Sequence, residues 1–347
     1  MSVLKPITIV GGGLAGLTLG IGLRQRGIPV TVWEAGGYPR HRVCGEFISG
    51  RGQDALVRLG LRELLVKAGA VLAPAAVFYQ GHSCSRARPV NPPALCLSRF
   101  VMDALLAERL RACGGELRER SRWPGETSNE GVIRASGRRA AAMTGRWRWL
   151  GLKAHARGVA LSAALELHGR EDGYVGLCRL PGGQVNVCGL FRRSARAGVS
   201  LGSWREKLRG SPGTPLHARL AGAAFDEDSF CAVAGLALEP ARASTQVECC
   251  IGDALTMIPP VTGNGMSMAI EAAELAQEPL AAWSRGRVEW AEARKEIARA
   301  CDRTFGQRLA WARWLQWLMF TPLAQGGIGA LLLRSDWLWR SMFERTR

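Results

Sequence analysis

The sequence has ten cysteines but none of the paired spacings that a structural zinc site or a disulfide framework uses. No Cys-x-x-Cys pair occurs, and the cysteines are scattered through segments predicted to be strands and helices. This pattern is typical of free thiols in a reducing compartment. We therefore predict no metal site.

Lysine is scarce, with five residues among the 46 basic ones, although the formal net charge is +17. Clustered cations favour nucleic acids as partners, because binding releases counterions from the polyanion. Here the arginines are spread along the chain, and no sequence-recognisable nucleic-acid-binding module is present. We predict that the protein has no nucleic-acid partner.

The chain also lacks an uninterrupted apolar run at its N-terminus. Gly11, Gly12, Gly13 and Gly16 interrupt the apolar start where a signal peptide needs a continuous helix. We interpret this start as a first β-strand and expect a cytoplasmic protein. The 347 residues, 47% of them hydrophobic, are enough to build two packed domains.

Residues 7–10 form a β-branched run, which is followed by a glycine-rich turn and an apolar helical stretch to Leu23. This order is typical of a dinucleotide-binding βαβ unit. Gly11 permits the tight turn, Gly13 lets the backbone approach a pyrophosphate, and Gly16 lets the helix pack closely on the strand. We predict that the helix N-terminus faces the phosphates.

The unit continues with Gly27, which is predicted to end the helix, and with a second strand over residues 28–33. Glu34 follows at the end of that strand, where a carboxylate accepts hydrogen bonds from ribose hydroxyls. The same carboxylate would repel a 2′-phosphate. The pattern therefore predicts FAD or NAD rather than NADP.

A second signal lies far downstream, where an apolar strand over residues 247–251 is followed by Gly252 and Asp253. Four further residues open the next helix: Gly263, Asn264, Gly265 and Met266. This segment resembles the glycine-aspartate motif of the FAD-dependent hydroxylases related to para-hydroxybenzoate hydroxylase. The resemblance implies that Asp253 holds the ribityl chain or pyrophosphate of FAD, and that the helix aims its positive end at the flavin.

The same resemblance implies a cofactor contact for Arg99, at the start of a helix that brings an arginine against FAD in these flavoproteins. The alternative is a solvated arginine at a helix start. At Ser136-Gly137-Arg138, in contrast, the hydroxylases usually carry an Asp-Gly pair. Because that pair is associated with both FAD and pyridine-nucleotide binding, its replacement argues against the usual docking of NAD(P)H.

Residues 40–49 resemble the geranylgeranyl-reductase branch of this superfamily, in which a Cys-Gly segment lies close to the flavin ring. The resemblance implies that Cys44 and Glu46 lie near that ring, with Glu46 as a candidate proton donor. A buried thiol and a residue that orients a turn are the alternatives. Gly176 stands where the reductases and the related halogenases carry a tryptophan, so a geranylgeranyl substrate cannot be carried over.

The predicted fold class is α/β, with a Rossmann-type FAD-binding domain interleaved with a smaller antiparallel-sheet substrate domain, plus C-terminal helices. We assign residues 1–70, 97–145 and 240–275 to the FAD-binding domain, residues 71–96 and 146–239 to the substrate domain, and residues 276–347 to the C-terminal helical region.

Lys153 and His155 are candidates for positioning the substrate or transferring a proton. Both lie on a predicted strand, where alternation places their side chains on one face. The alternative is that this face meets solvent. The other histidines form no ligand-spaced cluster and no Ser-His-Asp arrangement is apparent, so we expect the cofactor to carry the chemistry.

The C-terminal region is rich in tryptophan, and residues 314–333 contain no charge. About 20 such residues can cross a bilayer. Thr321-Pro322 and Gly326-Gly327 interrupt the stretch, however, which predicts two short amphipathic helices. The alternatives are a membrane span, a peripheral membrane contact and packing over the substrate pocket.

Together the patterns predict an FAD-dependent oxidoreductase that acts on a hydrophobic small molecule, such as a polyketide, an isoprenoid or an aromatic compound. One Rossmann motif is present, so NAD(P)H is expected as a transient electron donor. Hydride transfer to the substrate, as in geranylgeranyl reductases, is the favoured chemistry. The alternatives are a monooxygenase that uses oxygen and NAD(P)H, and an electron-transfer flavoprotein docked on a membrane or a protein.

Overall fold

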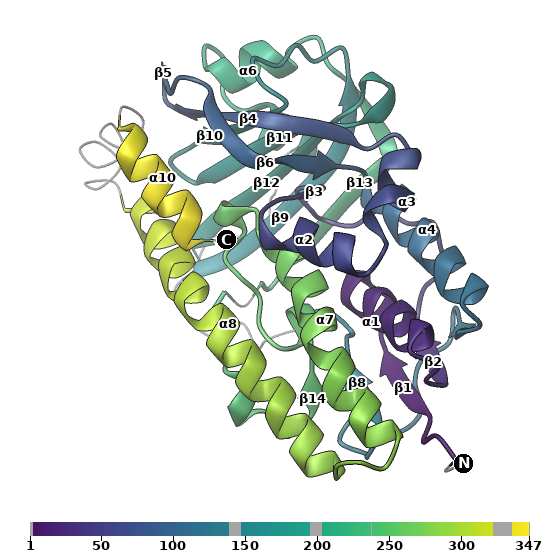
Figure 1. Ribbon diagram of the computed structural model, residues 1–347. Coiled ribbons are helices and arrows are strands. Elements are labelled where there is room, and N and C mark those ends of the chain that lie inside the picture. The colour runs from purple at the N-terminus through teal and green to yellow at the C-terminus, as the bar shows by residue number, and fades with distance from the viewer. Residues whose placement is uncertain (1–2, 139–146, 195–202, 237, 322–334, 347) are drawn as a thin grey trace.

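The structure is a computed structural model that describes residues 3–138, 147–194, 203–236, 238–321 and 335–346. Two β-sheets lie at opposite ends of the molecule, with helices packed between them and along one side (Figure 1). This arrangement confirms the predicted α/β class with C-terminal helices.

The first sheet is parallel throughout and has the strand order β14-β8-β1-β2-β7. Its strands are β1 (Ile7–Val10), β2 (Val30–Trp33), β7 (Glu116–Arg118), β8 (Val132–Arg134) and β14 (Cys249–Cys250). Ile7 and Ile9 of the central strand β1 are fully buried. The glycine-rich turn follows the carboxyl end of this strand, where open parallel sheets bind their ligands.

Five helices cover this sheet or connect it to the second one. They are α1 (Leu14–Gln25), α2 (Arg51–Arg58), α3 (Arg62–Lys67), α4 (Arg99–Ala112) and α7 (Gly265–Ser284). Helix α1 ends before Gly27, whose φ of +78° is the left-handed conformation predicted for a helix end. Helices α1, α4 and α7 pack with the sheet in one continuous apolar core.

The second sheet has nine strands in the described residues and is the larger of the two. Its path is β13 (Ala224–Ala234), β9 (Trp147–Arg157), β12 (Val185–Ser194), β11 (Gly173–Arg179), β10 (Leu165–Gly169), β4 (Val71–Gln80), β6 (Arg88–Cys96) and β3 (Phe47–Ile48), with β5 (Ser83–Cys84) beside β4. It is antiparallel except where β10 pairs with β4. Helices α5 (Trp204–Arg209) and α6 (Pro215–Leu220) pack their leucines on one face.

The division into two domains stays a prediction, but the sheet to which each strand belongs can be compared with the predicted domain boundaries. The strands of the parallel sheet all come from residues assigned to the FAD-binding domain. Strand β3 lies in the second sheet although its residues fall within 1–70. The chain thus touches the second sheet once before β4 begins, at Phe47 and Ile48.

Two helices end the described chain: α8 (Trp290–Met319) and α10 (Asp336–Arg345). The prediction of two short helices over residues 314–333 was wrong in its first part, because residues 314–319 are the last turns of the 30-residue helix α8. That helix ends before Thr321-Pro322, since proline cannot continue it. Residues 322–334 lie outside the described part of the chain. Among the described helices, none has both the length and the apolar character that a membrane crossing needs.

Helix α8 is held on α7 by a buried ion pair. The Nη1 and Nη2 atoms of Arg308 donate to the two carboxylate oxygens of Glu271, at 2.8 and 2.9 Å, and both residues are buried. A buried pair of this kind contributes little net stability, but the loss of one partner leaves an uncompensated charge.

We predict that Arg308→Met lowers the free energy of unfolding by about 3–5 kcal/mol, because Glu271 loses its partner inside the core. Arg308→Met/Glu271→Leu should recover most of this loss. Arg26→Met, which breaks the exposed pair between Arg26 and Glu278, serves as the control and should cost less than about 1 kcal/mol. Urea denaturation measures all three, and a double variant no more stable than Arg308→Met would contradict the prediction.

Candidate active site

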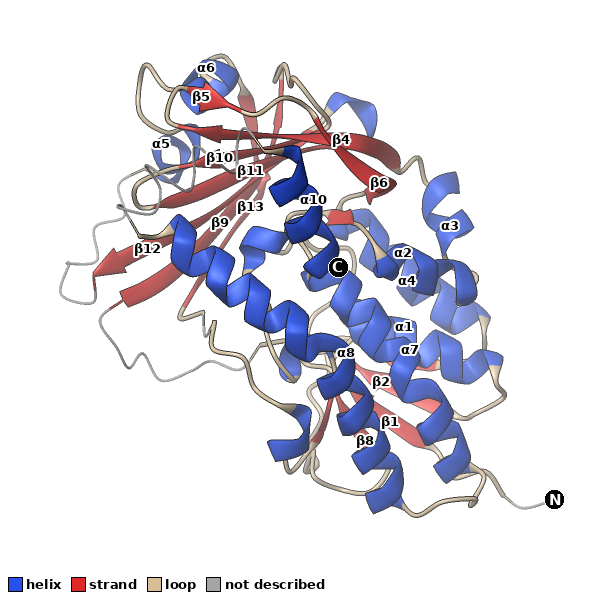
Figure 2. Cartoon of the chain, turned by 60° about the vertical axis from the view of Figure 1, so that its left-hand side comes forward, coloured by secondary structure: helices blue, strands red, loops and turns tan. Residues whose placement is uncertain are grey.

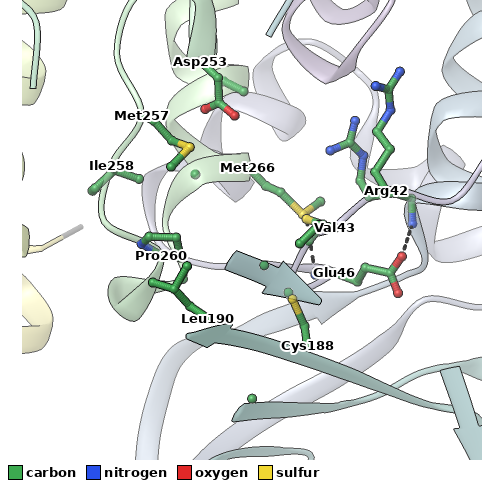
Figure 3. A pocket seen from close by; sticks show the side chains of 18 of the residues that line it. Arg42, Val43, Glu46, Cys188, Leu190, Asp253, Met257, Ile258, Pro260 and Met266 are labelled. Atoms are coloured by element: carbon green, nitrogen blue, oxygen red, sulfur yellow. Dashed lines mark hydrogen bonds between the residues drawn. The ribbon is translucent and has the colours of Figure 1, made fainter. Parts of the chain in front are cut away.

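A cavity of about 1500 Å³ lies between the parallel sheet and the second sheet. Figure 3 shows Asp253 and Met266 on one side of it and the β-sheet residues Cys188 and Leu190 on the other. The volume exceeds the roughly 300–1,000 Å³ that one small-molecule pocket typically has. The space is therefore large enough for a dinucleotide together with a second molecule.

The glycine-rich turn forms one end of the cavity. Gly11 has a φ of +114°, and a Cβ atom there would overlap the backbone of Ala135. A Cβ atom at Gly16 would overlap the carbonyl oxygen of Gly11, so helix α1 can pack closely only with glycine. A Cβ atom at Gly13 would meet no atom within 4 Å. The structure thus has the tight turn, the open backbone and the close helix packing that the sequence predicts.

Glu34 lies at the end of β2 and orders this turn. One carboxylate oxygen accepts a hydrogen bond from the Gly12 amide at 2.9 Å, and the other accepts from the Gly36 amide at 2.8 Å and from Arg40 at 3.1 Å. The residue is 5% exposed and lines the cavity. Its position beside Gly12 is where a nucleotide ribose would lie.

Asp253 faces the cavity from the short 3-10 turn Gly252–Ala254 (Figure 3). The surrounding protein raises the pKa of its carboxyl group, and the charges of Arg99 and Arg138 act in the opposite direction. Both arginines line the same cavity. Asp253 can accept hydrogen bonds from hydroxyl groups of a ligand, and the two arginines supply positive charge near a pyrophosphate.

The alternative interpretation of Arg99 as a solvated residue at a helix start is wrong, because the side chain is mostly buried. Its guanidinium donates to both carboxylate oxygens of Asp103, at 2.7 and 2.8 Å, and its side chain is 11% exposed. Arg42 binds the same fully buried carboxylate at 2.9 Å. Asp103 therefore fixes two arginines at the cavity wall, and the sequence analysis missed both Asp103 and Arg42.

The N-terminus of α7 forms the wall next to Asp253. Gly265 and Met266 line the cavity, and the side chain of Asn264 makes no capping hydrogen bond to the helix. The Asn264 amide instead donates to the backbone carbonyl of Thr346 near the chain end. The first amide groups of α7 thus have no side-chain cap and can donate to an electron-rich ligand edge.

Glu46 joins the two halves of the cavity wall. It is fully buried and has a φ of +60°, a conformation that a residue with a side chain adopts only under constraint. Its carboxylate accepts from the Arg99 amide at 2.9 Å and from His155 Nε2 at 2.7 Å. Glu46 therefore connects the start of α4 to strand β9.

Lys153 and His41 extend this network. The Lys153 ammonium lies 3.6 Å from the Glu46 carboxylate and donates to His41 Nδ1 at 3.0 Å. Burial and the neighbouring Lys153 and His155 lower the pKa of His41 to about 4, so its ring is neutral at pH 7. The proton of that neutral ring is then on Nε2. We call His41, Glu46, Lys153 and His155 the polar cluster.

The strand register explains why Lys153 and His155 face inward. Lys153 pairs with Cys188 on β12 and with Cys231 on β13, and both cysteines line the cavity. Directly paired residues point to the same face, so the predicted common face of Lys153 and His155 is the cavity side. The alternative of a solvent-facing side is wrong, because the two residues are 0% and 2% exposed.

Cys44 lies two residues before Glu46 and lines the cavity. Burial raises the pKa of its thiol, and the thiol is therefore protonated at neutral pH. The backbone carbonyl of Cys44 accepts a hydrogen bond from Asn186 on β12 at 2.8 Å. The Cys-Gly-Glu segment is thus tied to the second sheet on both sides of Gly45.

The predicted site residues fall into two groups. Those that line the cavity are Gly11, Gly13, Glu34, Cys44, Glu46, Arg99, Asp253, Gly263, Gly265 and Met266. Those that do not line it are Gly16, Lys153, His155, Gly252 and Asn264, of which Lys153 and His155 bind the cavity residues His41 and Glu46. Sequence reasoning missed His41, because only the tertiary fold brings it to Lys153, 112 positions away.

Residues 9–62 match the family model described as the NAD(P)-binding Rossmann-like domain. The whole chain resembles solved flavoenzymes. The p-nitrophenol 4-monooxygenase of Pseudomonas putida is 16% identical with a TM-score of 0.76, over 99% of this chain and 98% of the other. The fold is that of flavin-dependent monooxygenases and halogenases.

Two halogenases extend this likeness. A myxobacterial chondrochloren halogenase is 19% identical with a TM-score of 0.74, over 92% of this chain and 83% of the other. A flavin-dependent brominase is 16% identical with a TM-score of 0.73, over 98% of this chain and 92% of the other. No curated protein sequence matches the chain. The resemblance predicted for the wider superfamily is confirmed at the level of the fold, but the geranylgeranyl-reductase branch is not shown.

We predict that Glu46→Gln lowers the free energy of unfolding by about 3–5 kcal/mol, because the buried Lys153 ammonium loses its counter-charge. Glu46→Gln/Lys153→Met should recover most of that loss. Urea denaturation at pH 7 measures both variants. If the double variant is as unstable as the single one, the two charges do not stabilise each other.

We also predict that Asp253→Ala weakens FAD binding by about 1.5–3 kcal/mol through loss of charged hydrogen bonds. Cys44→Ser should leave the affinity unchanged, because a hydroxyl replaces a neutral thiol. Titration of each apoprotein with FAD, followed by flavin fluorescence, measures the difference. Equal affinity of Asp253→Ala and the wild type would show that Asp253 does not contact the cofactor.

Proposed function

We propose that the protein is an FAD-dependent monooxygenase that inserts oxygen into a hydrophobic small molecule. The observation that carries this proposal is that one continuous cavity connects a dinucleotide-type glycine turn to an apolar chamber under the second sheet. The fold that the chain shares with flavin-dependent monooxygenases and halogenases supports it. We therefore propose oxygen insertion in place of the hydride transfer that the sequence favoured.

The residues present fit FAD. The open backbone at Gly13 leaves room for a pyrophosphate, Glu34 is placed for a ribose, and Asp253 lies on the path from there to the N-terminus of α7. Arg42, Arg99 and Arg138 provide positive charge along the same wall. When bound, FAD accepts a hydride from NAD(P)H and activates oxygen for transfer to the substrate.

The substrate chamber lies beyond the flavin end of the cavity. Its lining residues are mostly apolar or aromatic and include Phe78, Leu165, Leu190, Val233, Leu318, Met319, Trp339 and Phe343. Such a lining binds hydrophobic molecules and keeps water away from the reacting atoms. Gly176 also lines the chamber, and a Cβ atom there would meet no atom closer than 3.7 Å. The missing tryptophan at this position therefore leaves additional space for the substrate.

The polar cluster holds a proton beside this chamber. His41 lines the cavity and stacks on Phe100 with ring centroids 4.5 Å apart, which fixes its ring. Because Lys153 donates to its Nδ1, His41 can donate from Nε2 to a polar group of the substrate. Glu46, Lys153 and His155 act through His41 and through the Cys44-Gly45-Glu46 backbone, as positioning residues.

Reduction of a carbon-carbon double bond is the second candidate. The observation in its favour is that Cys44 and Glu46 both reach the cavity wall, as the resemblance to the reductases implies. An electron-transfer flavoprotein does not need a large apolar chamber, because it binds no small-molecule substrate. The cavity therefore argues against the docked electron carrier.

Oxygen labelling distinguishes a monooxygenase from an enzyme that reduces a carbon-carbon double bond. We predict that the FAD-loaded protein, given NAD(P)H, ¹⁸O₂ and a panel of phenolic, polyketide-like and isoprenoid compounds, forms a product that contains one ¹⁸O atom. Mass spectrometry of the product measures this. His41→Asn should lower turnover of a hydroxylated aromatic substrate more than it lowers FAD affinity, because it removes a ring donor at the chamber.

Two results of the same experiment would contradict the monooxygenase proposal. A product two hydrogen atoms heavier than its substrate, formed equally fast without oxygen, would assign the protein to the reductases and overturn the proposal. Oxidation of NAD(P)H with no change in any compound would instead favour an electron carrier.

A further inference from the structure

Three tryptophans on the outer side of α8 and α10 are exposed to solvent. Trp317 is 58% exposed, Trp337 is 74% exposed and Trp314 is 40% exposed. Large aromatic side chains are normally covered in a soluble protein, so a group of them on one surface marks an interaction site.

The two helices that carry these side chains are in contact with each other. Trp311 and Trp314 have ring centroids 5.6 Å apart, and the Arg345 guanidinium of α10 lies 4.7 Å from the centre of the Trp311 ring. Trp337 and Arg345 are eight positions apart and so fall on neighbouring sides of α10. Figures 1 and 2 show α10 beside α8 next to the second sheet. We call Trp311, Trp314, Trp317 and Trp337 the tryptophan patch.

The charged residues around the tryptophan patch are mostly basic. From residue 303 to residue 320 the sequence has three arginines and no acidic residue. Arg303, Arg313, Arg340 and Arg345 are exposed on this part of the two helices. The acids beside them are Glu344, which is exposed, and Asp336, which forms ion pairs with Arg86 and Arg88. The surface around the tryptophan patch therefore combines amphipathic rings with positive charge. This combination complements an anionic lipid surface rather than a neutral one.

The same two helices form part of the cavity wall. Leu315, Leu318 and Met319 of α8 line the cavity, as do Trp339 and Phe343 of α10. The ring centroids of Trp339 and Phe78 on β4 are 4.6 Å apart. The outer tryptophans are thus separated from the apolar chamber by the thickness of one helix layer.

We propose that the tryptophan patch docks the protein on an anionic membrane surface. The rings lie at the headgroup level and the surrounding arginines pair with lipid phosphates, as in interfacial proteins that do not cross the bilayer. This inference goes beyond the proposed function and does not depend on the chemistry in the cavity. A membrane-bound position places the apolar chamber next to the phase in which hydrophobic compounds accumulate.

Vesicle flotation tests the docking directly. The full-length protein should float with vesicles of phosphatidylcholine and phosphatidylglycerol, stay behind with pure phosphatidylcholine, and be released by high salt. Trp317→Ser/Trp337→Ser should abolish flotation. Trp147→Ser, which removes a tryptophan of 41% exposure on β9, is the matched control and should float like the wild type. Arg313→Gln and Arg340→Gln should each weaken binding about fivefold.

Three results would overturn the proposal. They are no flotation with anionic vesicles, equal flotation with both vesicle types, and unchanged flotation of Trp317→Ser/Trp337→Ser. Circular dichroism and FAD affinity identical to the wild type verify that the variants are folded. If the wild type is instead a dimer in solution that this double variant dissociates, with no vesicle binding, the patch is a contact between two copies of the chain.

Discussion

The buried carboxylate of Glu46 is the constraint on which the two halves of this molecule depend. It accepts hydrogen bonds from the first amide of α4 and from His155 on β9, and it lies opposite the Lys153 ammonium. A residue with a φ of +60° costs on the order of 1–3 kcal/mol and persists only where its surroundings compensate. The compensation here comes from helix α4 and from strand β9 of the second sheet at once, so these two elements fix the segment of residues 41–47 at Glu46.

This constraint determines the shape of the cavity. Because residues 41–47 run between the sheets, the space on either side has different walls. Arginines and glycine-rich backbone line the part against the parallel sheet, whereas apolar strands and the C-terminal helices line the part beyond it. One end can hold a charged dinucleotide and the other a hydrophobic compound. The division is physical, because a charged group in the apolar end, or an apolar molecule against the arginines, would leave charged groups without water and without hydrogen-bond partners.

Local signals in the sequence predicted the parallel half of the fold well. The βαβ start follows from β-branched runs and from glycines that close packing demands, and Gly11 and Gly16 are required in the structure for those reasons. Asp253 and α7 were predicted from a resemblance. Glu46, Lys153 and His155 were each named as candidates, but the sequence did not predict that they meet or that His41 joins them, because His41 and Glu46 lie more than 100 positions from Lys153 and His155. Such contacts come from tertiary packing and leave no local pattern. The extent of helix α8 was missed because the uncharged stretch from Trp314 was interpreted as separate short helices, whereas α8 runs without a break from Trp290 to Met319.

Binding of a whole flavin adenine dinucleotide in the cavity is tested most directly by a comparison of FAD with FMN. The turn at Gly11–Gly13 and Glu34 would hold the adenosine half that FMN lacks. Titration of the apoprotein by calorimetry should therefore give one FAD per chain and much weaker binding of FMN, and heat should release FAD from the purified yellow protein. A protein that binds FMN as tightly as FAD, or that binds neither, would contradict the account.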